Sequence, residues 1–207
     1  MAIENDFYIV SDEVYEKLIY EGRKHICIAS LSDAIKSRTV VINGFSKAYA
    51  MTGWRVGYAA CPIEIIKAIN GIQSHMTSNT NSIAQKAAVE ALQGNQKSIE
   101  EMIVAFDERR KYLFERLNSI EGIDCAPANG AFYLMPNVSS YYGKSFDGQM
   151  INNSIDLAQY ILDQAKVAVV PGEAFEAPQN IRIAYSNGLE NISEGMNRFE
   201  SALGLLK

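Results

Sequence analysis

Hydrophobic positions in the first half of the chain form short runs that predict buried strands. The runs lie at residues 7–10, 39–42 and 55–60 and lack helical spacing. Acidic residues, glycine or proline follow soon after each run. Pro62 then predicts the start of a helix, and an alanine-rich segment predicts another helix over 83–92. Strands separated by long connections predict a piece of a parallel α/β sheet.

The second half of the chain begins with a long helical pattern and then changes in character. Apolar residues at helical spacing predict a helix over 98–120, and we expect its charged positions 107–111 to form a solvated face. Further strands are predicted at 131–135, 167–170 and 181–184, with helices over 155–165 and from a capping box at 191–194. The change near residue 96 predicts two domains, residues 1–95 and an α+β domain over 96–207.

Composition narrows the possible classes of protein. Of the 207 residues 48% are hydrophobic, which is enough for a sizeable core, and the net charge of -5 argues against a nucleic-acid partner. No apolar stretch reaches the length of a membrane span, and the N-terminus lacks the basic and apolar regions of a signal peptide. Three scattered cysteines and two histidines predict neither a disulfide framework nor a metal site. We therefore expect a soluble cytoplasmic protein.

Polar residues follow two of the predicted strands. Asp12 stands at the carboxyl end of the first strand, with Tyr15 three residues on, and the second strand leads to Lys47. Ligands in open α/β sheets bind outside the carboxyl ends of strands, so a carboxylate, a phenol and an amine are expected to converge. Arg55 follows eight residues after Lys47, and a planar guanidinium suits bidentate contact with a phosphate.

Three segments resemble those of a known family. The segment over 46–57, Ser-Lys-Ala-Tyr-Ala-Met-Thr-Gly-Trp-Arg-Val-Gly, resembles the lysine-bearing segment of class I aminotransferases. It is most similar to the bacterial branch of aspartate aminotransferases. Residues 12–15 resemble the Asp-x-x-Tyr pair of that family, and residues 180–186 resemble its C-terminal arginine strand. The order and rough spacing of all three segments agree with the family.

The resemblance implies pyridoxal 5'-phosphate as the cofactor and a role for each matched residue. Lys47 would bond to the cofactor's aldehyde and later move a proton. Asp12 would keep the pyridine nitrogen protonated, and Tyr15 would hydrogen-bond to the ring's phenolate oxygen. Arg55 would hold the phosphate, with Ser46 as a further contact.

The substrate and the fold are also implied by the resemblance. Arg182 would bind the substrate α-carboxylate through two hydrogen bonds. The implied fold class is α/β, the C-terminal portion of a fold-type I pyridoxal-phosphate-dependent transferase, with part of the large α/β domain and the small α+β domain. The family's upstream phosphate-binding loop, ring-stacking aromatic residue and cofactor-binding asparagine do not occur in this sequence. Gly44 stands where some relatives have a phosphate-binding serine.

The implied activity is transfer of an amino group between aspartate and 2-oxoglutarate. We expect the full-length protein to be a homodimer and the 207-residue chain alone to be inactive. Alternatives on the same site are an aromatic or alanine aminotransferase or a carbon–sulfur lyase. An aminotransferase-like sensor domain of a transcription regulator is an alternative of another class. Asp12 could instead cap a helix, and Arg55 or Arg182 could be structural.

Overall fold

The computed structural model describes residues 1–207 as two compact units, unit 1 (Met1–Ile103) and unit 2 (Val104–Lys207). Unit 1 contains β1 (Ile9–Asp12), α1 (Asp33–Lys36), β2 (Thr39–Gly44), β3 (Gly57–Ala60), α2 (Ile63–Met76) and α3 (Ser82–Gln93). Helix α4 (Lys97–Asn118) begins in unit 1 and continues into unit 2. Unit 2 contains β4 (Tyr133–Leu134), β5 (Ser145–Phe146), β6 (Gln149–Met150), α5 (Ser154–Ala165), β7 (Val170–Pro171), β8 (Ile181–Ala184) and α6 (Leu189–Leu203).

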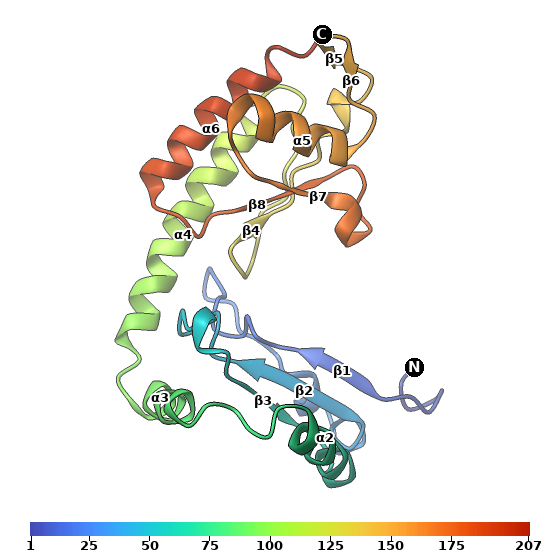
Figure 1. Ribbon diagram of the computed structural model, residues 1–207, viewed down its shortest axis with the longest axis vertical. Helices are drawn as coiled ribbons and strands as arrows, with labels where there is room; N and C mark the ends of the chain where they lie inside the picture. Colours follow the sequence, from blue (N-terminus) through green and yellow to red (C-terminus); the bar gives the residue numbers. More distant parts are fainter. The chain divides into compact units, whose positions relative to one another are not determined.

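The sheet of unit 1 has the order β1-β2-β3 (Figure 1). Strands β1 and β2 are parallel, as the sequence predicts, whereas β3 runs antiparallel to β2. The expectation of a wholly parallel sheet is therefore wrong for β3. The chain returns from Gly44 to Gly57 through a compact loop rather than a crossover helix, and such a short return favours an antiparallel partner.

One face of this sheet carries exposed apolar side chains. Alternate residues point to opposite faces, and the parallel register places Asp12 beside Ile42 and Val10 beside Val40. Val10 is 67% exposed and Ile42 is 40% exposed, whereas Val41, on the opposite face, is buried. Asp12 therefore reaches solvent on the open face of the sheet, at the carboxyl end of its strand.

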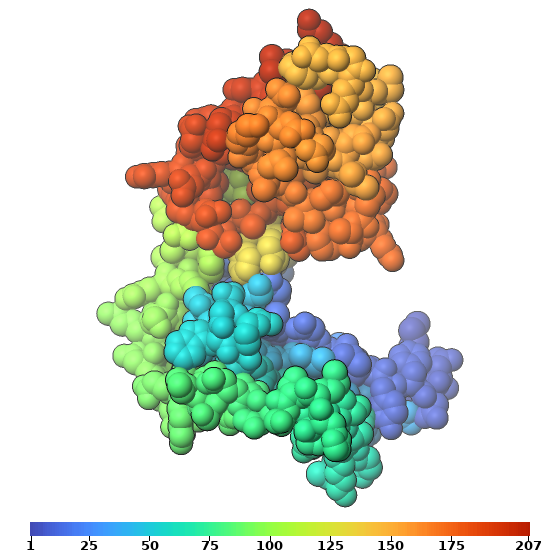
Figure 2. Space-filling view, viewed as in Figure 1, coloured from blue at the N-terminus to red at the C-terminus, as the bar shows by residue number.

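Unit 2 packs three helices against a small antiparallel sheet of order β4-β8-β7 (Figure 1). In the space-filling view its yellow-to-red residues form one packed body (Figure 2). Helices α5 and α6 are joined by the hydroxyl of Tyr160, which donates to the carbonyl oxygen of Ala202 at 2.7 Å. The core of unit 2 consists of fully buried aliphatic and aromatic side chains, among them Leu113, Leu117, Leu134, Leu157, Ile161, Ile181, Tyr185 and Phe199.

Two details of unit 2 differ from the sequence predictions. The hairpin β5–β6 was not predicted, although Asp147 and Gly148 adopt the positive φ angles, 47° and 80°, that a tight turn requires. Helix α6 begins at Leu189 after Gly188, so Asn191 lies inside the helix and the predicted capping box is wrong.

The two compact units divide within α4, between Ile103 and Val104, and the predicted domain boundary at residue 95 lies just before this helix. The assignment of the two parts to a large and a small domain stays a prediction.

The charged face of α4 is also not uniformly solvated. Arg110 is only 3% exposed, donates to the Asp107 carboxylate at 2.8 Å and donates to the carbonyl oxygen of Ala128 at 2.9 Å. Burial alone would raise the pKa of Asp107, but hydrogen bonds from Lys111 and Arg110 outweigh it and lower that pKa. The prediction of a solvated face is therefore wrong for Arg110. None of the helices combines the length and apolar character needed to cross a membrane.

Candidate functional site

A cavity of about 460 Å³ opens at the carboxyl ends of β1 and β2. Its volume falls within the roughly 300–1,000 Å³ of small-molecule sites. Four of the predicted site residues line it, namely Asp12, Ser46, Lys47 and Arg55. The structure thus brings a carboxylate, a hydroxyl, an amine and a guanidinium around one space, all within unit 1.

The loop that carries Lys47 is anchored by its apolar residues. Phe45, Ala48 and Met51 recur every third position and are all buried, at 4%, 2% and 9% exposure. Phe45 and Met51 pack with Val56 against small alanines of α3. Ser46 and Lys47 lie between these anchors, are only partly buried and line the cavity. Burial of the anchors therefore determines where the Lys47 amine stands.

Two glycines let β2 and β3 approach closely beneath the cavity. Gly44 and Gly57 are direct partners across the two strands. A Cβ on Gly57 would lie 2.9 Å from the carbonyl oxygen of Asn43, and one on Gly44 would lie 3.2 Å from that of Val56. A side chain at Gly57 would therefore force the strands to shift, whereas one at Gly44 would need the Val56 carbonyl to move by only a few tenths of an ångström. Glycine at position 44, where some relatives have serine, thus allows the closer approach.

Arg55 leaves the loop from an unusual backbone conformation. Its φ of 53° is in the left-handed region, directly after a 3₁₀ turn at Thr52–Trp54. Its Nη1 donates to the carbonyl oxygen of Thr52 at 2.9 Å, which uses one of the five N–H donors of the guanidinium. The exposed guanidinium can therefore bind an anion in the cavity with its other donors.

Asp12 and Tyr15 are positioned by the turn after β1. The Asp12 Oδ1 accepts a hydrogen bond from the backbone N–H of Val14 at 3.1 Å, which orients the carboxylate. The ring centroid of Tyr15 lies 5.8 Å from the Lys47 Nζ. Asp12 does not cap a helix here, because the residues after β1 form turns rather than a helix.

The neighbouring Glu13 is a buried structural residue that the sequence reasoning did not single out. Its carboxylate lies 2.8 Å from the His25 Nε2, and it accepts hydrogen bonds from the backbone N–H of Ile28 and from the hydroxyl of Ser11. Burial would raise the pKa of Glu13, but these bonds and one from Cys27 lower it. Glu13 thereby ties the segment around His25 to the end of β1, next to Asp12.

Glu13, Glu16 and His25 bring potential metal-ligating atoms within 4.8 Å of one another. The contact between Glu13 and His25 already explains this proximity as a hydrogen-bonded pair around a buried carboxylate. The positions of Glu13 and His25 are therefore explained without a metal ion.

Arg182 lies on β8 in unit 2, where aromatic rings surround it. Its Cζ is 4.4 Å from the ring centroid of Tyr133 and 4.6 Å from that of Phe175. Sequence reasoning identified Arg182 but not its contacts with these two rings. It also missed Asn43 and Thr52, which line the unit 1 cavity; their polar side chains close to Ser46 and Lys47 were the available signal.

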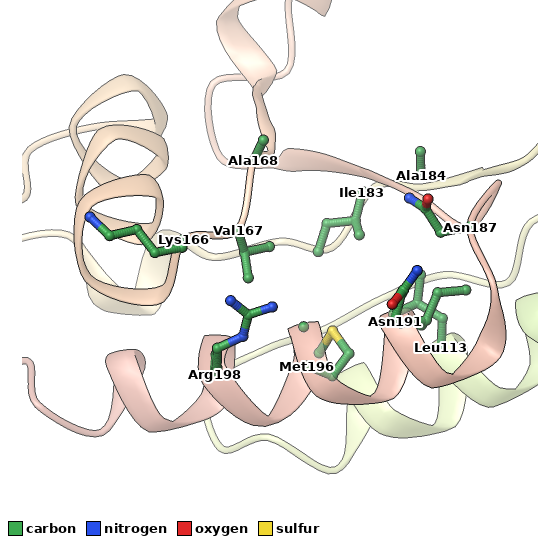
Figure 3. Close-up of a pocket in the computed structure, with 12 residues that line it drawn as sticks. Leu113, Lys166, Val167, Ala168, Ile183, Ala184, Asn187, Asn191, Met196 and Arg198 are labelled. Atoms are coloured by element: carbon green, nitrogen blue, oxygen red, sulfur yellow. The ribbon is translucent and has the colours of Figure 1, made fainter.

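A second cavity, of about 280 Å³, lies within unit 2 and contains none of the predicted site residues. In Figure 3 apolar Ile183 lies on one side of this space and Met196 and Leu113 lie on the other, with Asn187 and Asn191 at one end. The Lys166 ammonium points away from this space in the same view. The cavity thus lacks the converging carboxylate and amine of the unit 1 site.

Comparison with known proteins gives concordant results. The chain is 42% identical over 200 residues to an aspartate aminotransferase of Bacillus subtilis, covering 97% of this chain and 50% of that protein. The crystal structure of the aspartate aminotransferase from Rhizobium meliloti matches with a TM-score of 0.95 and 39% identity, over 99% of this chain and 52% of that one. An aromatic aminotransferase from Pyrococcus horikoshii OT3 matches with a TM-score of 0.89 and 37% identity, over 98% and 52%.

The chain therefore spans about half the length of the relatives it matches. Its fold is α/β and is that of the fold-type I transferases to which these structures belong. The family model for aminotransferase class I and II matches residues 1–199. Because this match covers nearly the whole chain, the protein belongs to the aminotransferase class I and II family.

Proposed function

We propose that this chain carries the lysine-bearing part of an aminotransferase that uses pyridoxal 5'-phosphate to move an amino group from an amino acid to a 2-oxo acid. The observation that carries the proposal is the single cavity lined by Asp12, Ser46, Lys47 and Arg55. The aldehyde of the cofactor would bond to an amine, and its phosphate would bind cationic and hydroxyl donors. A carboxylate would keep its ring nitrogen protonated. All these groups line the cavity.

Each of the candidate site residues would have a defined role. Lys47 would hold the cofactor covalently and, once displaced by substrate, would move a proton to and from the substrate Cα. Asp12 would hold a proton on the ring nitrogen, and Tyr15 would orient the ring through its phenol. Arg55 and Ser46 would retain the phosphate. The bound cofactor itself supplies a positively charged ring that stabilises negative charge at Cα.

The proposed substrates are aspartate and 2-oxoglutarate, with Arg182 binding the α-carboxylate of either one. Support comes from the relatives named as aspartate aminotransferases. The likeness to an aromatic aminotransferase favours aromatic amino acids as the alternative. Turnover of the full-length protein should be compared with aspartate, phenylalanine, alanine and cystathionine. A kcat/KM highest for aspartate supports the first assignment, and one highest for phenylalanine supports the alternative.

We further propose that the full-length protein is a cytoplasmic homodimer and that residues 1–95 belong to its large domain and residues 96–207 to its small domain. The exposed apolar residues support a larger assembly. Helix α2 has no buried residue, and its Ile72 and Met76 are 60% and 75% exposed. Such surface is usually covered by further protein. Sedimentation of the full-length protein tests the dimer, and a monomer at micromolar concentration would contradict it.

Labelling of the full-length protein tests the central assignment. The protein is incubated with pyridoxal phosphate, reduced with borohydride and digested, and the peptides are mapped by mass. We expect the reduced cofactor on Lys47. Lys47→Ala should lose both the label and transamination, while the matched control Lys86→Ala, at an exposed position on α3, should keep both. Normal turnover and covalent cofactor in Lys47→Ala would exclude the proposed chemistry.

The 207-residue chain alone is expected to be inactive. The relatives are about twice as long, and the open sheet face leaves Asp12 and the cavity beside solvent. Water weakens every electrostatic interaction with a bound cofactor. Measurable transamination by the purified chain would show that the site is complete without further protein.

A further inference from the structure

The guanidinium of Arg182 lies over two aromatic rings rather than against a carboxylate. Its Cζ lies over the ring of Tyr133 at 4.4 Å and over the ring of Phe175 at 4.6 Å. Both distances are within the roughly 6 Å over which a ring face attracts a cation. An aromatic face holds a guanidinium by its plane and leaves the N–H groups at its edge available, whereas a carboxylate would occupy them.

The ring of Tyr133 reaches Arg182 because of the strand register. Tyr133 on β4 pairs with Ala184 on β8, and Arg182 lies two residues before Ala184 on the same face of that strand. Tyr133 and Arg182 are therefore diagonal neighbours across the two strands, a separation that an aromatic ring and a long side chain can bridge.

Phe175 reaches Arg182 through a tightly folded 3₁₀ turn, Gly172–Phe175. A Cβ on Gly172 would lie 2.0 Å from the carbonyl oxygen of Ala177, so only glycine allows the turn to close. The hydroxyl of Ser154 accepts from the Gly172 N–H at 2.8 Å and donates to the Glu173 carboxylate. The turn is thereby attached to the first residue of α5, which fixes the backbone position of Phe175.

We propose that Phe175 and Tyr133 are positioning residues that hold the Arg182 guanidinium so that its N–H edge receives the carboxylate of the substrate. This inference rests on the proposed function and deepens its substrate site. A long arginine side chain loses rotational freedom when it binds a ligand, and the rings remove that freedom beforehand. The consequence is tighter binding of both the amino acid and the 2-oxo acid, with little effect on the proton transfers.

Steady-state kinetics of the full-length, cofactor-loaded enzyme test the proposal. In Phe175→Leu we expect KM for both substrates to rise about fivefold, in keeping with a single cation–π contact, while kcat changes less than twofold. Phe175→Tyr keeps a ring face and should restore the KM of the wild type. Tyr133→Leu should raise KM in the same way. Leu162→Ala, which shortens another exposed apolar side chain of unit 2, is the matched control and should leave KM unchanged.

Phe175 is 42% exposed, so its replacement is not expected to unfold the protein, and a melting curve checks this. If the wild type is active and both Phe175→Leu and Tyr133→Leu have the same KM as the wild type, the positioning role alone is overturned. A Phe175→Tyr variant with the same defect as Phe175→Leu would also overturn it. A wild type that takes up pyridoxal phosphate at Lys47 but turns over no amino acid would refute the proposed function, and with it the substrate role of Arg182.

Discussion

Replacing Gly172 by alanine should destabilise unit 2 by about 3 kcal/mol. The new Cβ would lie 2.0 Å from the carbonyl oxygen of Ala177 and 2.2 Å from that of Asn180. Ordinary contacts of this kind are 3.4 Å or longer, so the two carbonyl oxygens must withdraw by about 1.4 and 1.2 Å respectively. Three hydrogen bonds at Gly172 and Ala177 would be lost: Ala177 N–H to the Gly172 carbonyl at 3.0 Å, Asn180 N–H to the Ala177 carbonyl at 2.9 Å, and Gly172 N–H to the Ser154 hydroxyl at 2.8 Å. Each contributes about 1 kcal/mol.

Urea unfolding of the 207-residue chain, followed by circular dichroism, measures this loss. With a slope of about 2 kcal/mol/M, the midpoint should fall by about 1.5 M. Hydrogen exchange assigns the change to unit 2 if the amides of α5 and β8 lose protection. Gly71→Ala is the matched control, because nothing lies within 4 Å of the added carbon and the site is inside α2.

In that control alanine should raise stability by about 1 kcal/mol, since glycine is a poor helix former. The same substitution is thus expected to act with opposite signs at two sites. A Gly172→Ala chain whose midpoint stays within 0.2 M of the wild type would refute the reasoning that this turn has no room for a side chain.

Three further outcomes are expected. Burial raises the pKa of Cys125 to about 11, so alkylation at pH 8 should modify it only after denaturant is added. Asp107→Ala should cost about 3 kcal/mol in urea unfolding because it removes a carboxylate that binds the buried Arg110 guanidinium. Glu108→Ala, at an exposed position on the same helix, should cost under about 0.5 kcal/mol. Folding lowers the pKa of Glu13, so the ionised Glu13 carboxylate stabilises the fold above its ordinary pKa of 4.5. This stabilisation is lost as the pH falls through the lower pKa of the folded state. The difference in unfolding free energy between wild type and Glu13→Gln should therefore shrink below pH 4.5.

Much of the candidate site was predictable because its signals are local. Asp12 ends the first strand and Ser46 and Lys47 follow the second, and the apolar runs of both strands are plain in the sequence. Carboxyl ends of neighbouring parallel strands meet at one edge, and Arg55 ends the loop that begins with Ser46 and Lys47. The twelve-residue spacing between Gly44 and Gly57 could not reveal that β3 turns back antiparallel. That outcome depends on the close approach of two glycines and on the anchoring of Phe45 and Met51 against α3, which are contacts between distant segments.

The sequence by itself determined the helices and strands with strong periodicity, the family and the residues that would perform the chemistry, since these depend on residue types at short spacing. Only the tertiary structure decided which side chains support them. Phe175 meets Arg182 because a glycine lets a turn close and a strand register places Tyr133 alongside. Arg110 can be buried because the carbonyl oxygen of Ala128, eighteen residues away, accepts a hydrogen bond from its guanidinium. Contacts of this kind arise from how the chain packs, and packing depends on the shapes of all the neighbours at once.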